Sequence, residues 1–172
     1  RVSKETGLDV GTIARLVFDS GATLSQTDNR TNILFLGVGG GTHEGADLTD
    51  TILIASMNLA TKKLSLLSLA RDIWSDTLKD KINSAYHYGE LKKKGGGLVL
   101  SKAIIEDVSG LPIHYSIVVD FSGFTNIIDL VGGVDITVPV AFTDADYPIE
   151  GKEKDLCDGD ITYRCRYEVL HF

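Results

Sequence analysis

Residues 32–72 read NILFLGVGGGTHEGADLTDTILIASMNLATKKLSLLSLARD, and this stretch sets the architecture of the chain. It contains three apolar runs, at 33–36, 51–55 and 64–69. Short apolar runs bounded by turn residues are typical of buried strands. The polar link between the second and third runs is short enough for a hairpin. We therefore expect strands at 32–38, 50–57 and 63–70.

Outside this stretch, apolar residues recur with helical spacing in several segments. They predict helices at 5–19, 82–90, 97–108 and 121–131, the second of them capped by Asn83. Further strands are expected at 115–120 and 134–138, whereas 92–97 reads as a flexible loop and 143–160 as acidic, irregular chain.

The order of these elements predicts an α/β fold, in which a central mixed β-sheet is flanked by helices on both faces. We expect residues 1–30 to form an N-terminal helix and linker, and residues 31–172 to form the α/β domain. A chain of 172 residues is long enough to bury a substantial core.

The formal net charge of -7 argues against general nucleic-acid binding, which needs a basic surface. No stretch approaches the roughly 20 apolar residues that span a bilayer, and no signal peptide is visible. The chain begins and ends abruptly. We expect it to be part of a longer protein, with any membrane anchor lying in a segment outside it.

Cys157 and Cys165 are the two cysteines, and they stand eight residues apart in a polar stretch. A hairpin would bring them within disulfide range, which would favour an extracytoplasmic setting. The alternative is a pair of free thiols, and the sequence leaves both open. Metal binding by this pair alone is not expected, since no third or fourth ligand is evident.

Charged residues stand where the predicted strands end, and they are the candidate site. Asp47 and Asp50 offer the hard oxygen ligands that suit Mg²⁺. Arg71 offers a planar fork matched to phosphate, and Lys81 could add a second positive charge. Each of these features, taken alone, is also compatible with an ordinary solvated loop or a surface ion pair.

The other chemistry-bearing patterns are weaker. The glycine cluster GVGGGT at 37–42 lacks the Gly-Lys-Ser/Thr ending of a P-loop, and no helix is predicted after it. This weighs against a nucleotide-binding α/β domain. His43 and His87 have no visible serine or cysteine partner, so triad chemistry is not supported.

Five linked segments resemble one family, the LytR-CpsA-Psr cell-wall glycopolymer ligases. They are NILFLGVGG, DLTDTILIASMN, KKLSLLSLARDIW, DKINSAYHYG and HYSIVVDFSGFTNIIDLVGGVDITVP, which together cover roughly residues 32–140. The resemblance implies a mixed-sheet α/β fold and an apolar tunnel for a polyprenyl chain, with a pyrophosphate and Mg²⁺ at the tunnel mouth. It also implies a location at the extracytoplasmic face of the cell membrane or in the cell wall.

Carried over by position, Asp50 matches the family's metal or pyrophosphate-site aspartate, Arg71 its pyrophosphate-binding arginine, and Lys81 the lysine of its K-I-N-x-A-Y segment. The implied reaction moves a glycopolymer from a polyprenyl-pyrophosphate carrier to a hydroxyl of peptidoglycan, assisted by Mg²⁺. Arg71 and Asp50 are thus the catalytic candidates, Arg71 and Lys81 the pyrophosphate-binding ones, and Asp50 and Asp47 the metal ligands.

The chain also departs from the family pattern. Gly39 and Leu48 replace a frequent aspartate and arginine, and Ala70 replaces the proline of P-R-D. Asp47 would substitute for the missing carboxylate. The family's arginine-rich terminal segment is expected to be absent, with residues 164–166 (Arg-Cys-Arg) read as strand, so the domain would be C-terminally incomplete. These departures keep a second hypothesis open, a non-catalytic envelope module that binds lipid or glycopolymer.

Overall fold

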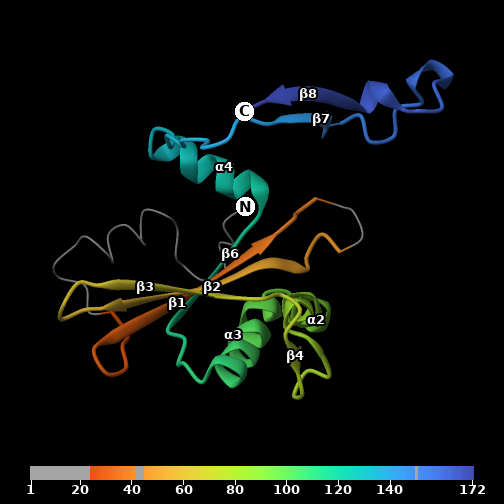
Figure 1. The fold of residues 1–172 in the computed structure, drawn as a ribbon. Helices are drawn as coiled ribbons and strands as arrows, with labels where there is room; N and C mark the ends of the chain where they lie inside the picture. Colours follow the sequence, from red (N-terminus) through yellow and green to blue (C-terminus); the bar gives the residue numbers. More distant parts are fainter. Residues whose placement is uncertain (1–23, 42–44, 150) are drawn as a thin grey trace. The chain divides into compact units, whose positions relative to one another are not determined.

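The computed structural model describes residues 24–41, 45–149 and 151–172 (Figure 1). The helix predicted at 5–19 lies outside these residues. The chain divides into two compact units, one ending at Gly132 and the other running from Gly133 to Phe172. None of the described helices is long and apolar enough to cross a membrane.

The first unit is built on a four-stranded mixed sheet in the order β3-β2-β1-β6. Strands β1 (Arg30–Val38), β2 (Thr49–Asn58) and β3 (Leu64–Leu69) correspond to the three predicted strands. Strands β2 and β3 form the predicted hairpin, and β1 also pairs antiparallel with β2. Strand β6 (Tyr115–Val119) pairs with β1 in parallel. The α/β prediction with a mixed sheet is therefore confirmed.

Alternation along the strands directs one set of side chains into the core. Leu34 and Leu36 of β1 are buried on the same face as Ile52 and Ile54 of β2. Helix α3 (Gly96–Ser109) completes this core with Ile104 and Ile105, which are the residues that its helical spacing turns inward. Burial of such an apolar cluster is the main stabilising contribution to the unit.

Helices lie on both sides of the sheet. Helix α2 (Ala85–Lys92) and α3 are side by side on one side of it, and helix α4 (Phe121–Leu130) lies on the other (Figure 1). Helix α4 is preceded by Asp120, whose side chain accepts a hydrogen bond from the Gly123 N–H at 2.7 Å. This is the ordinary N-cap geometry, and it starts the helix directly after β6.

The predicted cap of the second helix is wrong. A 3-10 turn, η2 (Ile82–Ser84), precedes α2, and the N-cap position belongs to Ser84, which makes no side-chain cap. The Ala85 N–H already donates to the Ile82 carbonyl within this turn, so the helix start needs no side-chain acceptor from Asn83.

The lysine-glycine segment predicted as a loop at 92–97 is a loop only at residues 93–95. Helix α2 ends at Lys92 and α3 starts at Gly96, which leaves a link of residues 93–95. The glycines permit close helix packing: a Cβ atom on Gly89 would lie 2.4 Å from the Gly96 carbonyl oxygen. The Glu90 carboxylate accepts from the N–H groups of Gly95 (3.1 Å) and Gly97 (2.9 Å), which fixes the turn.

The second unit is an antiparallel hairpin of β7 (Thr143–Pro148) and β8 (Tyr167–His171), carrying the 3-10 turns η3 (Cys157–Gly159) and η4 (Arg164–Arg166). Two predictions fail here. Residues 134–138 alternate like a strand, but no strand of the described chain pairs with them. Acidic residues 143–148 are a strand because β8 supplies the partner.

Residues 164–166 form the turn η4 and not the predicted strand. Tyr163 precedes the turn with a φ of 53°, in the left-handed region. The Arg166 guanidinium lies 3.9 Å from the centre of the Tyr163 ring, and its Nε donates to the Asp155 carbonyl at 2.8 Å. These local contacts curl the segment away from an extended conformation.

Candidate functional site

Four charged side chains form a connected chain at one edge of the sheet. The Arg71 guanidinium donates to the Asp50 carboxylate, and its Nε lies 3.8 Å from the carboxylate of Asp72. Lys81 Nζ donates to Asp72 Oδ1 at 2.6 Å. The three residues predicted at the pyrophosphate site, Asp50, Arg71 and Lys81, are therefore brought together, with Asp72 as the link.

Strand register places the first pair. Ile52 is the partner of Leu69 in the antiparallel β2–β3 ladder. Two residues further along in that register, Asp50 stands opposite Arg71, just where the two strands separate. Side chains at directly opposed positions lie on the same face of a sheet and within contact distance. The ion pair is thus a direct consequence of the hairpin register.

A second, smaller hairpin supplies Lys81. It pairs β4 (Trp74–Ser75) with β5 (Asp80–Lys81), and Ile82 N–H donates to the Ile73 carbonyl at 2.9 Å in continuation of the ladder. The hairpin reverses the direction of the chain after Asp72. It therefore brings the Lys81 ammonium group back to the carboxylate of Asp72, which lies nine residues earlier in the sequence.

The site is electrostatically balanced and open to water. The hydrogen bond and charge of Lys81, together with the charge of Arg71, hold the pKa of Asp72 below its usual 3.8. About half of each side chain in the Arg71–Asp50 pair is exposed, 52% and 57%. Exposed pairs contribute little to stability. An anionic ligand can therefore reach both cations and exchange with their carboxylate partners.

Asp47, predicted as a metal ligand, makes a different contact. Its Oδ2 lies 2.7 Å from His87 Nδ1, on helix α2. The sequence analysis found no partner for His87, because no spacing rule links it to a residue 40 positions earlier. Among the described residues, Asp47 contacts His87 through Oδ2, and its Oδ1 makes no hydrogen bond or ion pair.

The glycine cluster approaches the start of helix α4. Gly40 has a φ of 71°, and a Cβ atom there would lie 3.0 Å from the Asp120 Cβ. The hydrogen bond that the Asp120 carboxylate accepts from the Gly123 N–H lowers the pKa of Asp120 below its usual 3.8. The glycines thus serve a tight turn packed against a helix N-terminus, which agrees with the absence of a P-loop fingerprint.

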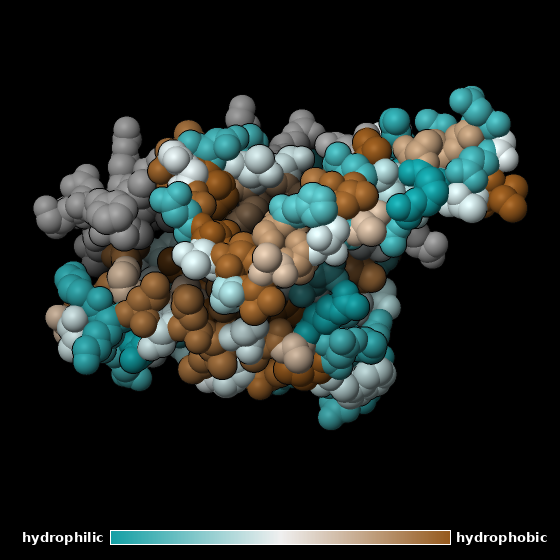
Figure 2. Space-filling view, turned by 45° about the horizontal axis from the view of Figure 1, so that its top comes forward, coloured by the Kyte–Doolittle hydropathy of each residue, from teal (hydrophilic) through white to brown (hydrophobic). Residues whose placement is uncertain are grey.

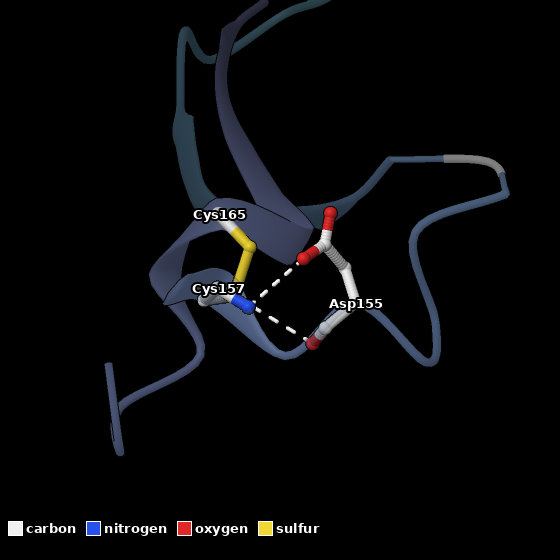
Figure 3. Close-up of side chains that lie close together, drawn as sticks. All are labelled: Asp155, Cys157 and Cys165. Atoms are coloured by element: carbon white, nitrogen blue, oxygen red, sulfur yellow. Dashed lines mark hydrogen bonds between the residues drawn. A yellow bond between two sulfur atoms is a disulfide. The ribbon is translucent and has the colours of Figure 1, made fainter. Parts of the chain in front are cut away.

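Cys157 and Cys165 form a disulfide, which resolves the alternative that the sequence left open (Figure 3). The Asp155 carboxylate accepts from the Cys157 N–H at 2.8 Å in the same turn. In the described part of the chain, these three residues form the one cluster of three or more potential metal ligands. Because both sulfurs are bonded to each other, no thiolate is available for a metal.

Apolar surface is also exposed on the first unit. Helix α4 and the residues after it present large apolar side chains to solvent, among them Phe121, Phe124, Leu130 and Val131. Figure 2 shows apolar side chains gathered over much of one face. A separate cavity of about 430 Å³ lies between α2, α3 and the β4–β5 hairpin, lined by Leu78, Tyr88 and Leu100 among others.

Comparison with known proteins places the chain in a family. The model of the LytR_cpsA_psr family matches residues 10–162. The polyisoprenyl-teichoic acid–peptidoglycan teichoic acid transferase TagU of Oceanobacillus iheyensis is 38% identical over 121 residues, 67% of this chain and 37% of that protein. TagU of Bacillus cereus is 33% identical over 99 residues, covering 55% of this chain and 30% of the relative.

Solved structures agree on the fold. Bacillus subtilis TagV superposes with a TM-score of 0.56 and 25% identity, over 86% of this chain and 53% of its own. TagT (YwtF), solved with a bound octaprenyl pyrophosphate lipid, has a TM-score of 0.54 and 21% identity, over 72% and 47%. The chain thus spans about a third of the curated relatives and half of the solved chains. The family model covers most of its length, and the chain belongs to the LytR-CpsA-Psr family.

Proposed function

We propose that this chain carries the diphosphate-binding part of an enzyme that transfers a glycopolymer from a polyprenyl-pyrophosphate carrier to a hydroxyl of peptidoglycan. The observation that carries the proposal is the linked arrangement of Asp50, Arg71, Asp72 and Lys81. Two cations bridged by one carboxylate and exposed to water suit a diphosphate, which presents several anionic oxygens close together.

The transfer is a phosphoryl substitution. The acceptor hydroxyl oxygen attacks the phosphorus that bears the glycopolymer and forms a new phosphodiester bond. The phosphoanhydride bond to the other phosphorus breaks, polyprenyl monophosphate leaves, and the hydroxyl proton passes to solvent or a nearby base. Arg71 and Lys81 would stabilise the negative charge that moves onto the leaving phosphate.

The carboxylates have the chemistry that Mg²⁺ prefers. Asp50 uses one oxygen for Arg71 and Asp47 uses one for His87, so each has a second oxygen to offer to an ion. Both side chains are partly exposed, which would let the ion keep several waters, as Mg²⁺ usually does. In this proposal Asp50 and Asp47 hold Mg²⁺, which would neutralise phosphate charge when bound.

The names of the relatives support the substrate class. The TagU proteins are named for transfer of polyisoprenyl-linked teichoic acid to peptidoglycan, and a TagT structure holds octaprenyl pyrophosphate. We propose a location at the extracytoplasmic face of the membrane, with attachment through a segment outside this chain. The Cys157–Cys165 disulfide supports this location, because disulfides persist in oxidising compartments.

A binding experiment tests the site. Purified protein is titrated with polyprenyl pyrophosphate in detergent, and Arg71→Ala and Lys81→Ala are compared with the unchanged chain. Loss of one charge-assisted contact should weaken binding about tenfold or more. Lys102→Ala is the matched control, since Lys102 is a partly exposed cation of helix α3 that is paired with Glu106. Equal affinities for all four proteins would refute the assigned site.

The second hypothesis, a non-catalytic envelope module, is favoured by one observation. Gly39 stands where the resemblance leads one to expect an aspartate, so one carboxylate of the site is missing. Release of polyprenyl phosphate from a glycopolymer-linked donor, measured with acceptor and Mg²⁺, separates the two. Tight binding without release would favour the module over the enzyme.

A further inference from the structure

Trp74 is the only tryptophan of the chain, and its side chain faces solvent. Trp74 as a whole residue is 58% exposed. The neighbours on either side point the other way: Ile73 packs against the apolar core and Ser75 is buried. Because successive side chains of a strand alternate between its two faces, the inward positions at 73 and 75 direct the indole outward.

The register of the small hairpin places this indole beside the candidate site. Trp74 is the direct partner of Lys81 in the antiparallel β4–β5 pair. Directly opposed residues project to the same face, with Cβ atoms about 5 Å apart. The ammonium of Lys81 is bonded to Asp72, so the indole lies alongside the charged chain that runs to Asp50.

The hairpin that carries Trp74 is held firmly. Ser75 Oγ accepts from the Leu78 N–H at 3.1 Å, and its carbonyl accepts from the Lys79 N–H at 2.8 Å. The Thr77 hydroxyl donates to Asp107 of helix α3 at 2.8 Å, which ties the hairpin to the core layer. A ligand that uses this indole therefore meets a surface that needs little further ordering.

A flat aromatic face beside hydrogen-bonding charges matches the surface of a sugar ring. A pyranose presents axial C–H groups on one face and hydroxyls at its edge. The first can stack on an aromatic ring, and the second can bond to carboxylate and ammonium groups. Asp72 and Lys81 offer those groups next to Trp74, whereas the neighbouring carboxylates are poorly suited to contact with anionic lipid headgroups.

We propose that Trp74, with Lys81 and Asp72, forms a subsite for a pyranose ring next to the diphosphate position. Only the position of the diphosphate in this inference rests on the proposed function. The stacking surface of Trp74 does not depend on that function. The ring would come from one of two sources with the same chemistry: the first sugar of a carrier-linked donor, or a sugar of the acceptor glycan.

The emission of the sole tryptophan gives a direct readout. Three ligands are titrated: a short-chain polyprenyl pyrophosphate, the same lipid carrying one N-acetylhexosamine on its diphosphate, and a phosphate-free tetrasaccharide of N-acetylglucosamine. Phosphatidylglycerol vesicles are titrated in the same way, as a test for a membrane contact. Binding is also measured by calorimetry for Trp74→Ala and Trp74→Phe. Val99→Ala serves as control, because Val99 is a similarly exposed apolar residue on helix α3.

Trp74→Ala should weaken binding of a sugar-bearing probe about three- to tenfold and leave the bare polyprenyl pyrophosphate within about twofold. Trp74→Phe should retain most of the affinity, and Val99→Ala all of it. A response to the sugar-bearing lipid identifies the donor ring, and a response to the tetrasaccharide identifies the acceptor.

Two results would overturn the subsite. One is unchanged affinity of Trp74→Ala for both sugar probes. The other is emission that responds only to phosphatidylglycerol vesicles, which would make Trp74 a membrane contact. Failure of the proposed function looks different: neither polyprenyl ligand binds the unchanged chain, while the tetrasaccharide still alters Trp74 emission.

Discussion

Asp50 and Arg71 stand opposite each other at the point where β2 and β3 separate, and their side chains form an ion pair. The pair lies two residues beyond the last ladder partners, Ile52 and Leu69. Its position therefore follows from the hairpin register, although it lies beyond the last β2–β3 partners, and about half of each side chain is exposed to water. This combination of fixed position and exposure supports the proposed diphosphate site.

The exposure of this pair predicts that it contributes little to folding. Arg71→Ala and Asp50→Ala should each change the free energy of unfolding by less than about 1 kcal/mol. Urea denaturation of the two variants measures this. A loss above about 2 kcal/mol would instead indicate a structural ion pair, since exposed pairs do not contribute that much.

Asp72 predicts a specific pH dependence. Its pKa is lowered on folding, chiefly by the hydrogen bond from Lys81. Such a carboxylate stabilises the folded state above its unfolded pKa, near 3.8, and this contribution is lost as pH falls through the lower folded value. Lys81→Ala should raise the pKa of Asp72 towards 3.8, as measured by NMR titration of the carboxyl carbon. Lys102→Ala should leave that titration unchanged.

The contact between helices α2 and α3 predicts that Gly89 cannot be enlarged. A Cβ atom there would lie 2.4 Å from the Gly96 carbonyl oxygen, which is backbone and cannot rotate away. Gly89→Ala should destabilise the unit by about 1–3 kcal/mol, although alanine favours helix elsewhere. Leu91→Ala, at an exposed position of the same helix, is the control in thermal unfolding. Equal melting temperatures would show that the helices can separate without cost.

The disulfide is expected to hold the turns of the second unit together. Cys157→Ser combined with Cys165→Ser should cost that unit about 2–3 kcal/mol, because the short loop is no longer closed in the unfolded state. Limited trypsin digestion should then cut residues 152–166 faster, while Trp74 emission, which reports on the first unit, stays the same. Two free thiols found by alkylation of the non-reduced native protein would contradict the bond itself.

The core predicts a contrast between two leucines of the same sheet. Leu34 is fully buried in β1, whereas Leu64 in β3 is largely exposed. Leu34→Ala should lower the free energy of unfolding by about 2–5 kcal/mol because it leaves a cavity. Leu64→Ala should change it by less than about 0.5 kcal/mol. Similar losses for both would mean that Leu64 is covered in solution.

Much of the architecture could be read from local patterns. The apolar runs of β1 and β2 and the spacing of α3 report which side of each element is buried, and burial is what makes these elements form. The proximity of Asp50 to Arg71 could also be predicted from the sequence, because a short hairpin link determines which residues of its two strands face each other.

Contacts between segments far apart in the sequence could not be predicted from these local patterns. Asp47 and His87 meet because α2 packs near the acidic loop, and Gly40 meets Asp120 because β6 runs beside β1. Residues 134–138 alternate like a strand but pair with no strand among the described residues, while acidic residues 143–148 pair with β8. An alternating pattern records a preference for one face, whereas a strand also needs backbone hydrogen bonds, and these depend on which other segment the fold brings alongside.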